Sequence, residues 1–309
     1  NAFSLFFGPV GKWISKTFGK APVLMSWVNP ALRVSVAQSA LKSHGYFNGS
    51  VNYKTIPMSN PKKAKIGYDV DMGHLYTIDS VAYEKFPEDA DSLLKRTLTD
   101  AVIHKGDAFD VSTLDAERKR VSILFRNNGY YYYQPSYASY LADTISVPGK
   151  VLMKFQLAEQ IPEKAKRKWY IGRVDLQLRK QIMEQLNDSL MHRNFKVHFN
   201  GRHSPMRPRV IMRDLKLRPG NIYSYDNYLE SSNRISGNGL FSIVDFQFTP
   251  RDSSATCDTL DLALNCVFDK PYDFYVETNY TGRTSGRMGP GLIVGFTKRN
   301  VFRGGEKLD

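Results

Sequence analysis

Apolar and polar residues alternate along several segments of the chain, and this period of two predicts strands. In the clearest run, Leu260, Leu262, Leu264, Cys266 and Phe268 alternate with Asp261, Ala263, Asn265 and Val267. Shorter runs predict strands at 51–55, 66–70, 74–83, 151–157 and 168–178. Between these runs, apolar residues at helical spacing predict helices, among them Leu114, Val121, Leu124 and Phe125 on one face. We therefore expect an α+β protein.

A short motif occurs three times. Segments 41–47, 125–131 and 235–241 each carry a glycine, Gly45, Gly129 or Gly239, followed by a pair of aromatic or apolar residues. Glycine reaches the left-handed conformation that commonly ends a helix, and the following pair can anchor an emerging strand. The glycines are 84 and 110 residues apart, which is the size of a small domain, so we expect copies of one building block.

A second motif precedes the last helix of two copies. Lys105, Gly106 and Asp107 are followed by Phe109, and Pro219, Gly220 and Asn221 by Tyr223. Ser112 and Ser224 then follow as candidate helix N-caps, and Arg207–Leu217 is the expected first helix of the third copy. The order strand, helix, helix, strand, strand predicts a three-stranded sheet with two helices on one face and an open opposite face.

These patterns divide the chain into four parts. We expect a first domain at 1–73 that is incomplete at its N-terminus, a second at 74–160, and a third at 168–270 with a basic insertion near 179–205. We expect residues 271–309 to form the first hairpin of a truncated β-barrel, because two alternating segments flank a Gly/Arg/Ser turn. Strands of about ten residues with aromatic ends have the length that crosses a bilayer in a β-barrel, which needs at least ~8 strands.

Composition and charge narrow the classes of function. The chain has 309 residues, 42% of them hydrophobic, and a net charge of +13. Segments 1–68 and 161–220 hold the whole excess, with 9 basic and no acidic residues in the first and 15 against 5 in the second. No nucleic-acid reading element accompanies them, so we expect no nucleic acid and instead anionic headgroups or an acidic protein. Cys257 and Cys266 are expected to be free thiols, and no apolar run is long enough for a membrane-spanning helix.

The motifs resemble those of the BamA/TamA outer-membrane assembly family, with tandem POTRA domains followed by the first hairpin of a C-terminal β-barrel. The resemblance is greatest to the TamA-like proteins of Bacteroidetes-type bacteria. It rests on the three glycine motifs, the approach to the second helix, and a barrel-start motif formed by Asn300, Phe302, Gly304, Gly305 and Glu306. It implies a location at the outer membrane, with this segment mainly in the periplasm. The implied partners are unfolded outer-membrane client proteins, a TamB-like or accessory lipoprotein partner, and outer-membrane lipid.

The same resemblance implies that the domains bind and position other chains, by addition of a strand to an open sheet edge. We expect such an edge at 241–248 or 51–56, with candidate residues Phe241, Ile243, Asp245, Phe246, Phe248, Val51 and Tyr53. The alternatives are a two-partner secretion transporter, or an envelope scaffold without translocation activity. No arrangement for catalysis, a cofactor or a metal is evident, so we do not expect an enzyme; His192, His198 and His203 match no metal-site spacing.

Two segments allow more than one interpretation. The aromatic run Tyr130–Tyr133, with Tyr137 and Tyr140, either forms a platform for clients or divides between core and surface, and the second is favoured. Residues 3–18 have the apolar spacing of an amphipathic helix. That helix either lies on a membrane or, as we favour, covers the sheet of the first domain.

Overall fold

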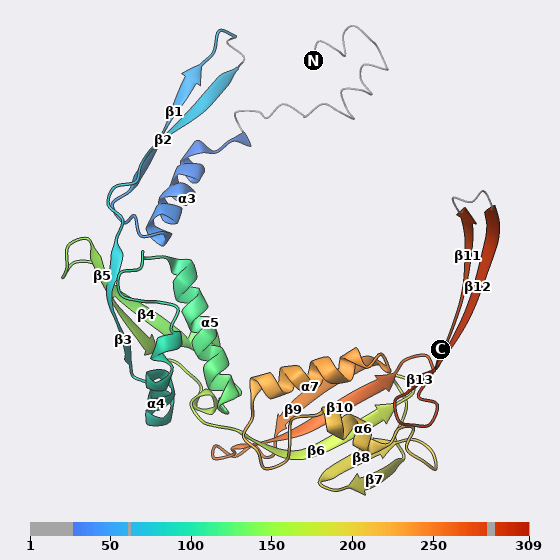
Figure 1. Cartoon of the computed structure of the whole chain (residues 1–309). Helices are drawn as coiled ribbons and strands as arrows, with labels where there is room; N and C mark the ends of the chain where they lie inside the picture. The colour runs from blue at the N-terminus through green and yellow to red at the C-terminus, as the bar shows by residue number, and fades with distance from the viewer. Residues whose placement is uncertain (1–26, 61–62, 283–287, 309) are drawn as a thin grey trace. The chain divides into compact units, whose positions relative to one another are not determined.

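The computed structural model describes residues 27–60, 63–282 and 288–308 (Figure 1). These described residues divide into two compact units, the first within residues 27–82, 102–116 and 141–154, and the second within residues 83–101, 117–140 and 155–308. The helix expected at 3–18 lies outside the described residues. Within the described part, no helix combines the length and the hydropathy needed to cross a bilayer.

The first unit begins with helix α3 (Pro30–Ser43), followed by strands β1 (Ser50–Pro57) and β2 (Ala64–Asp71). Asn29 caps the helix, because its side chain accepts a hydrogen bond from the Leu32 amide at 3.1 Å. β1 and β2 pair antiparallel, with Val51 opposite Val70. Both strands were predicted from the period of two, and that prediction is confirmed.

The next elements follow the predicted order of strand, helix, helix, strand, strand. They are β3 (Thr77–Glu84), α4 (Glu88–Arg96), α5 (Val111–Asn127), β4 (Ala138–Asp143) and β5 (Lys150–Leu157). The strands form a three-stranded sheet in the order β3-β5-β4. Helix α4 has three acidic residues in its first turn and two basic residues in its last turn, which suits the helix dipole.

The expected N-cap of α5 was wrong by two residues. The helix starts at Val111, so Asp110 and not Ser112 is the residue before it. Asp110 Oδ1 accepts a hydrogen bond from the Ser112 amide at 2.6 Å. Hydrogen bonds from Ser112 and His44 lower the pKa of Asp110 to about 2. The corresponding prediction for α7 (Tyr225–Gly237) is confirmed, because Ser224 Oγ accepts from the Asn227 amide.

The third copy contains five strands where three were predicted. β6 (Tyr170–Arg179), β7 (Asp188–His192), β8 (Phe195–Phe199), β9 (Phe241–Pro250) and β10 (Thr259–Phe268) form one sheet in the order β7-β8-β6-β10-β9. The two additional strands come from the basic insertion near 179–205. They pair antiparallel as a hairpin, and β8 also pairs in parallel with β6. Phe195, Val197 and Phe199 alternate toward the core and are buried, which fixes the register of β8.

Helices α6 (Pro208–Asp214) and α7 cover one face of this sheet (Figure 1). Ile211 and Ile235 from the helices share a buried cluster with Leu176, Leu262 and Leu264 from the strands. Both cysteines are free and buried, and burial raises the pKa of the Cys266 thiol to about 12. The alternation along β10 is explained by one face of the strand that meets the helices at Leu262, Leu264 and Cys266, while Leu260 on that strand packs with Trp169 and Cys257.

A hairpin follows the third copy, as expected. β11 (Tyr272–Gly282) and β12 (Met288–Arg299) pair antiparallel, and the short β13 (Lys307–Leu308) pairs with β12. Phe274 lies opposite Phe296 and Val276 opposite Val294, so these side chains share one face, and all four are more than half exposed. The hairpin therefore presents an apolar face.

Candidate functional site

Strand β9, at one edge of the five-stranded sheet, carries most of the candidate residues (Figure 1). They are Phe241, Ile243, Asp245, Phe246 and Phe248. Among the described residues, β9 pairs only with β10, from Phe241 opposite Phe268 to Pro250 opposite Leu260. A strand at a sheet edge leaves the backbone N–H and C=O groups of its outer side unpaired. β9 therefore presents a ten-residue open edge.

The side chains of β9 divide between the two faces of the sheet. Phe246 and Phe248 point to the helical side, where the ring of Tyr228 on α7 lies 5.3 Å and 5.9 Å from theirs, centroid to centroid. Ile243 and Asp245 are exposed on the opposite side. Packing of the aromatic face against α7 holds the strand in position while its outer backbone stays accessible.

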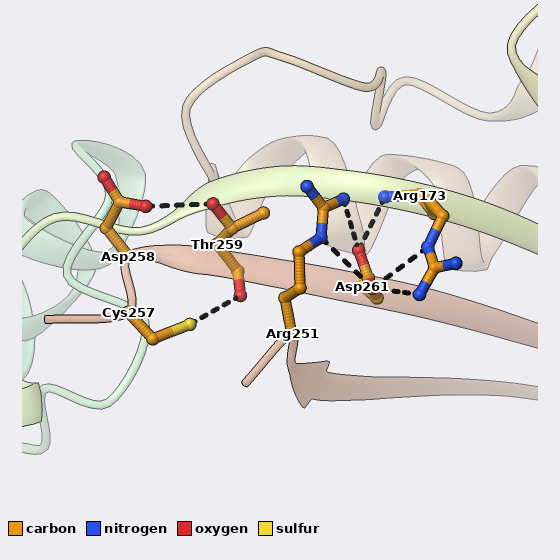
Figure 2. Close-up of polar contacts among 6 residues, drawn as sticks. All are labelled: Arg173, Arg251, Cys257, Asp258, Thr259 and Asp261. Carbon is orange, nitrogen blue, oxygen red and sulfur yellow. Dashed lines mark hydrogen bonds and ion pairs between the residues drawn. The ribbon is translucent and has the colours of Figure 1, made fainter. Parts of the chain in front are cut away.

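Asp261 holds the C-terminal end of β9 to the centre of the sheet (Figure 2). Its carboxylate on β10 accepts hydrogen bonds from the Arg173 amide at 2.7 Å and from Arg251 Nη2 at 2.8 Å. Arg173 lies on β6, and Arg251 directly follows β9. Partial burial of Asp261 opposes ionisation, but the hydrogen bonds from Arg251 and Arg173 outweigh it and lower the pKa of Asp261. A Cβ at Gly172 would lie 2.2 Å from Asp261 Oδ1, so only glycine admits the carboxylate there.

We expect Asp261→Asn to lower the free energy of unfolding at pH 7 by roughly 1–3 kcal/mol, because charge-assisted bonds to two arginines are lost. The lowered pKa means that the carboxylate stabilises the fold above its ordinary pKa, and that this contribution disappears as the pH falls through the folded value. Urea unfolding followed by Trp169 fluorescence should therefore show a deficit at neutral pH that shrinks in acid. The control is Asp245→Asn, which removes the same charge from an exposed position. A deficit that persists unchanged in acid would contradict the assignment.

The other candidate edge, with Val51 and Tyr53, lies on β1. Val51 is buried and lines an apolar groove of about 350 Å³ together with Leu41, Val70 and Met72, whereas Tyr53 is exposed. Among the described residues, β1 pairs only with β2. This hairpin therefore also has open edges, but it belongs to a two-stranded sheet.

Gly45 and Gly129 occupy equivalent surroundings. The Gly45 carbonyl accepts from the Tyr76 amide at 3.0 Å, and the Gly129 carbonyl from the Trp169 amide at 2.8 Å. Tyr76 and Trp169 in turn accept from the amides of Phe109 and Tyr223, the aromatic residues of the second motif. The end of one helix is thus held by the opening segment of the following copy.

Gly239 shares only part of this arrangement. All three glycines have positive φ, +83° at Gly45, +99° at Gly129 and +62° at Gly239, and each is the second residue after its helix ends. A Cβ at Gly239 would meet nothing within 4 Å among the described residues. The local turn is therefore repeated three times, whereas the hydrogen bond from the following copy to the glycine carbonyl is present at Gly45 and Gly129.

The aromatic run Tyr130–Tyr133 divides between a core and a junction. Tyr130 and Tyr133 are buried with Phe125, and the rings of Tyr131 and Tyr132 pack at 4.9 Å on Tyr223 and at 5.1 Å on Trp169. At the same junction, the Asn127 side chain bonds to Asp226 at 2.6 Å. The run therefore connects the second and third copies and is not an open platform for clients.

The barrel-start motif forms a compact loop after β12. Glu306 Oε2 accepts from the amides of Phe302 and Gly304, and the Gly305 amide donates to Asn300 Oδ1. Hydrogen bonds from its own backbone and from the backbones of Phe302 and Gly304 lower the pKa of Glu306. The loop also reaches the third copy, because Asn300 Nδ2 donates to the Pro205 carbonyl and the Arg207 amide to the Arg303 carbonyl.

The three histidines do not converge on a metal site. His192 lies on β7, His198 on β8 and His203 in the loop that follows. Within the part of the chain that the structure describes, no group of three or more His, Cys, Asp or Glu side chains is placed to hold a metal ion.

No model of a known protein family matches the sequence, and no curated protein is detectably similar to it. The structure is similar to BamA from Haemophilus ducreyi lacking POTRA domains 1–3, with a TM-score of 0.52 and 14% identity. That match covers 75% of this chain and 36% of the other. The chain thus spans about a third of that protein.

Two further similarities are weaker. POTRA domains 3–5 of Haemophilus influenzae BamA give a TM-score of 0.41 at 13% identity, covering 78% of this chain and 80% of theirs. CdiB from Acinetobacter baumannii gives a TM-score of 0.32 at 13% identity, and the match covers 92% of this chain and 46% of CdiB. The first similarity, at 14% identity, concerns the fold. The α+β class and the fold of POTRA domains, predicted from the sequence, are confirmed.

Proposed function

We propose that the chain is the periplasmic arm of an outer-membrane protein assembly or translocation factor, which binds and positions client or partner chains by strand addition to β9. The open edge of β9 carries this proposal. Backbone groups at such an edge pair with an added strand largely independently of its sequence, which suits a factor with many clients. The POTRA fold supports the assignment.

Several features favour β9 over the other edge of the same sheet. β9 has ten residues and β7 has five, so β9 offers the longer ladder. Asp245 is its only charged side chain, whereas charges on an edge strand discourage pairing. The Asp261 contacts and the packing on α7 keep the strand ordered, which lowers the entropic cost of binding.

The finer parts of the proposal rest on the sequence motifs. These motifs resemble those of the TamA-like proteins of Bacteroidetes-type bacteria, and on that resemblance we propose a TamB-like or accessory lipoprotein partner and no enzymatic activity. The β11–β12 hairpin would begin a barrel, with its apolar face toward outer-membrane lipid. A face of Phe274, Val276, Val294 and Phe296 suits hydrocarbon.

A photocrosslinking residue at Ile243 in the full chain tests the proposal. We expect it to capture extended segments of many unfolded outer-membrane proteins, because the side chain is 40% exposed beside the open backbone. Gln247→Lys, at an exposed position of the same strand, should reduce this capture to background, since an edge lysine discourages strand pairing. The same probe at Met191 on β7, an exposed side chain at the opposite edge, is the matched control.

Equal capture at Met191 and Ile243 would contradict strand addition to β9. Capture of one exported substrate would favour the two-partner secretion transporter, and capture of fixed envelope partners alone would favour the scaffold. Turnover of a hydrolase or ligase substrate by the purified chain would overturn the binding function.

A further inference from the structure

A cleft of about 330 Å³ lies beside the β7–β8 hairpin and is lined mainly by arginines. Its residues are His192, Arg193, Arg209, Met212, Arg213 and Arg218. The sheet order places β7 at the edge opposite β9, so this cleft is separate from the proposed strand-binding edge. Two segments of the basic block 161–220 build it: the hairpin inserted near 179–205, and α6 with the residues that follow it.

Four guanidinium groups share the cleft without a carboxylate among its lining residues. Arg213 Nε pairs with Asp214 at 3.3 Å, but Asp214 is buried and also accepts from Asn238. Within the described residues, Arg193, Arg209 and Arg218 have no ion pair with a carboxylate. Most of the positive charge in the cleft is therefore uncompensated, an arrangement that attracts anions.

The cleft is also partly preorganised. Arg218 Nη2 donates to the Met212 carbonyl at 2.7 Å, and its guanidinium carbon lies 5.5 Å from the centroid of the Phe195 ring. Arg209 and Arg213 are four residues apart on α6, so they share one face of the helix. Arg193 has a φ of +53°, a conformation that costs a side chain energy and that asparagine or glycine adopts more easily.

His192, which also lines the cleft, carries a buried polar atom. Its Nε2 atom is shielded from solvent and has no hydrogen-bond partner among the described residues. A buried polar atom without a partner is costly unless something satisfies it. Because the atom is shielded, an anion in the cleft would accept its hydrogen bond only after the ring turns toward the cleft.

We propose that this cleft binds a phosphate group. Phosphate offers several oxygens and up to two charges, which matches a set of guanidiniums better than the single charge of a carboxylate does, and guanidiniums bind phosphate through paired N–H donors. The group can be carried by a phosphorylated lipid headgroup or by a soluble phosphate compound. Both sources share the chemistry that the cleft recognises.

Calorimetric titration of the full chain with inorganic pyrophosphate tests the site. Arg193→Asn combined with Arg209→Gln removes two charges from exposed positions, and asparagine suits the left-handed φ, so the variant should fold. We expect its affinity to fall at least about tenfold, since hydrogen bonds to charged groups are lost. Lys180→Gln combined with Lys196→Gln removes the same charge from exposed positions outside the cleft and should change the affinity less than twofold. The His192 ring resonances should shift with pyrophosphate in the unaltered chain.

Vesicles of phosphatidylcholine containing phosphatidic acid distinguish the sources. Binding to them that is lost in the arginine variant and kept in the lysine variant supports a lipid headgroup. Binding of pyrophosphate alone supports a soluble phosphate. Equal losses in both variants would overturn the proposal, because they would reflect net charge. Binding of polyglutamate without pyrophosphate would also overturn it and indicate an acidic protein. Since neither variant alters β9, client capture at Ile243 tests the proposed function separately.

Discussion

Replacing Gly129 by alanine is expected to lower the free energy of unfolding by about 2–5 kcal/mol and to loosen the junction between the second and third copies. Two costs add here. At φ +99°, a side chain costs ~1–2 kcal/mol relative to glycine. The new Cβ would also lie 2.7 Å from Ile222 Cγ1 and 3.2 Å from Lys168 Cβ, and such overpacking costs about 1–3 kcal/mol.

Gly239→Ala is the matched control for this prediction. Gly239 has the same left-handed turn after its helix, but its Cβ position is open, so only the conformational cost of ~1–2 kcal/mol is expected there. Urea unfolding monitored by tryptophan fluorescence measures the free energy of unfolding of both variants. Trp169 lies at this junction, where its carbonyl accepts a hydrogen bond from the Tyr223 amide. Equal destabilisation by the two substitutions would show that close packing at Gly129 contributes nothing.

The repeat predicted more of the fold than any single segment did. One glycine after a helix is common, but three with similar sequences around them predict a shared turn, and the φ values at Gly45, Gly129 and Gly239 agree. The same repeat could have corrected the N-cap of α5. Aligning Phe109 with Tyr223 places Asp110 opposite Ser224, and both residues cap their helices. Local preference alone favoured Ser112 because serine is a common cap.

The insertion near 179–205 was not predictable in the same way. It has no counterpart in the second copy, and its strands have only five residues each. β8 becomes stable through parallel pairing with β6 and burial of Phe195 and Val197, which are long-range contacts that no local pattern specifies. The residues of the arginine cleft are up to 26 positions apart along the chain. Only the docking of the hairpin beside α6 brings them together, so the sequence did not predict the cleft.

The sheet topology explains why the candidate strand 241–248 lies at an edge. β9 follows α7 and turns back into β10, and β10 lies beside the opening strand β6, so β9 is left at the edge. What the sequence could not indicate is how the edge is held. Arg173, Arg251 and Asp261 are separated by up to 88 residues, and only the folded sheet brings them together.

Arg120→Met is expected to destabilise the fold by about 3–5 kcal/mol, because it removes the guanidinium that pairs with a buried carboxylate. Glu117 on α5 has no exposed surface, and it accepts from Arg120 Nε at 2.8 Å and Nη2 at 2.6 Å. The Tyr83 hydroxyl donates to the same carboxylate at 2.8 Å. Hydrogen bonding to Glu117 raises the pKa of Arg120, and burial, together with the Glu117 charge, raises that of Tyr83, so both remain donors across the physiological pH range.

The double variant Glu117→Gln with Arg120→Met separates the worth of the ion pair from the cost of breaking it. Removing both charges eliminates the buried negative charge that Arg120 neutralises, and the glutamine side chain still accepts from Tyr83, so the double variant should recover more than half of the loss. Urea unfolding of the wild type, both single variants and the double variant gives the coupling energy between the two residues. If the double variant is as unstable as the sum of the single variants, the two side chains act independently and the buried ion pair contributes no coupling energy.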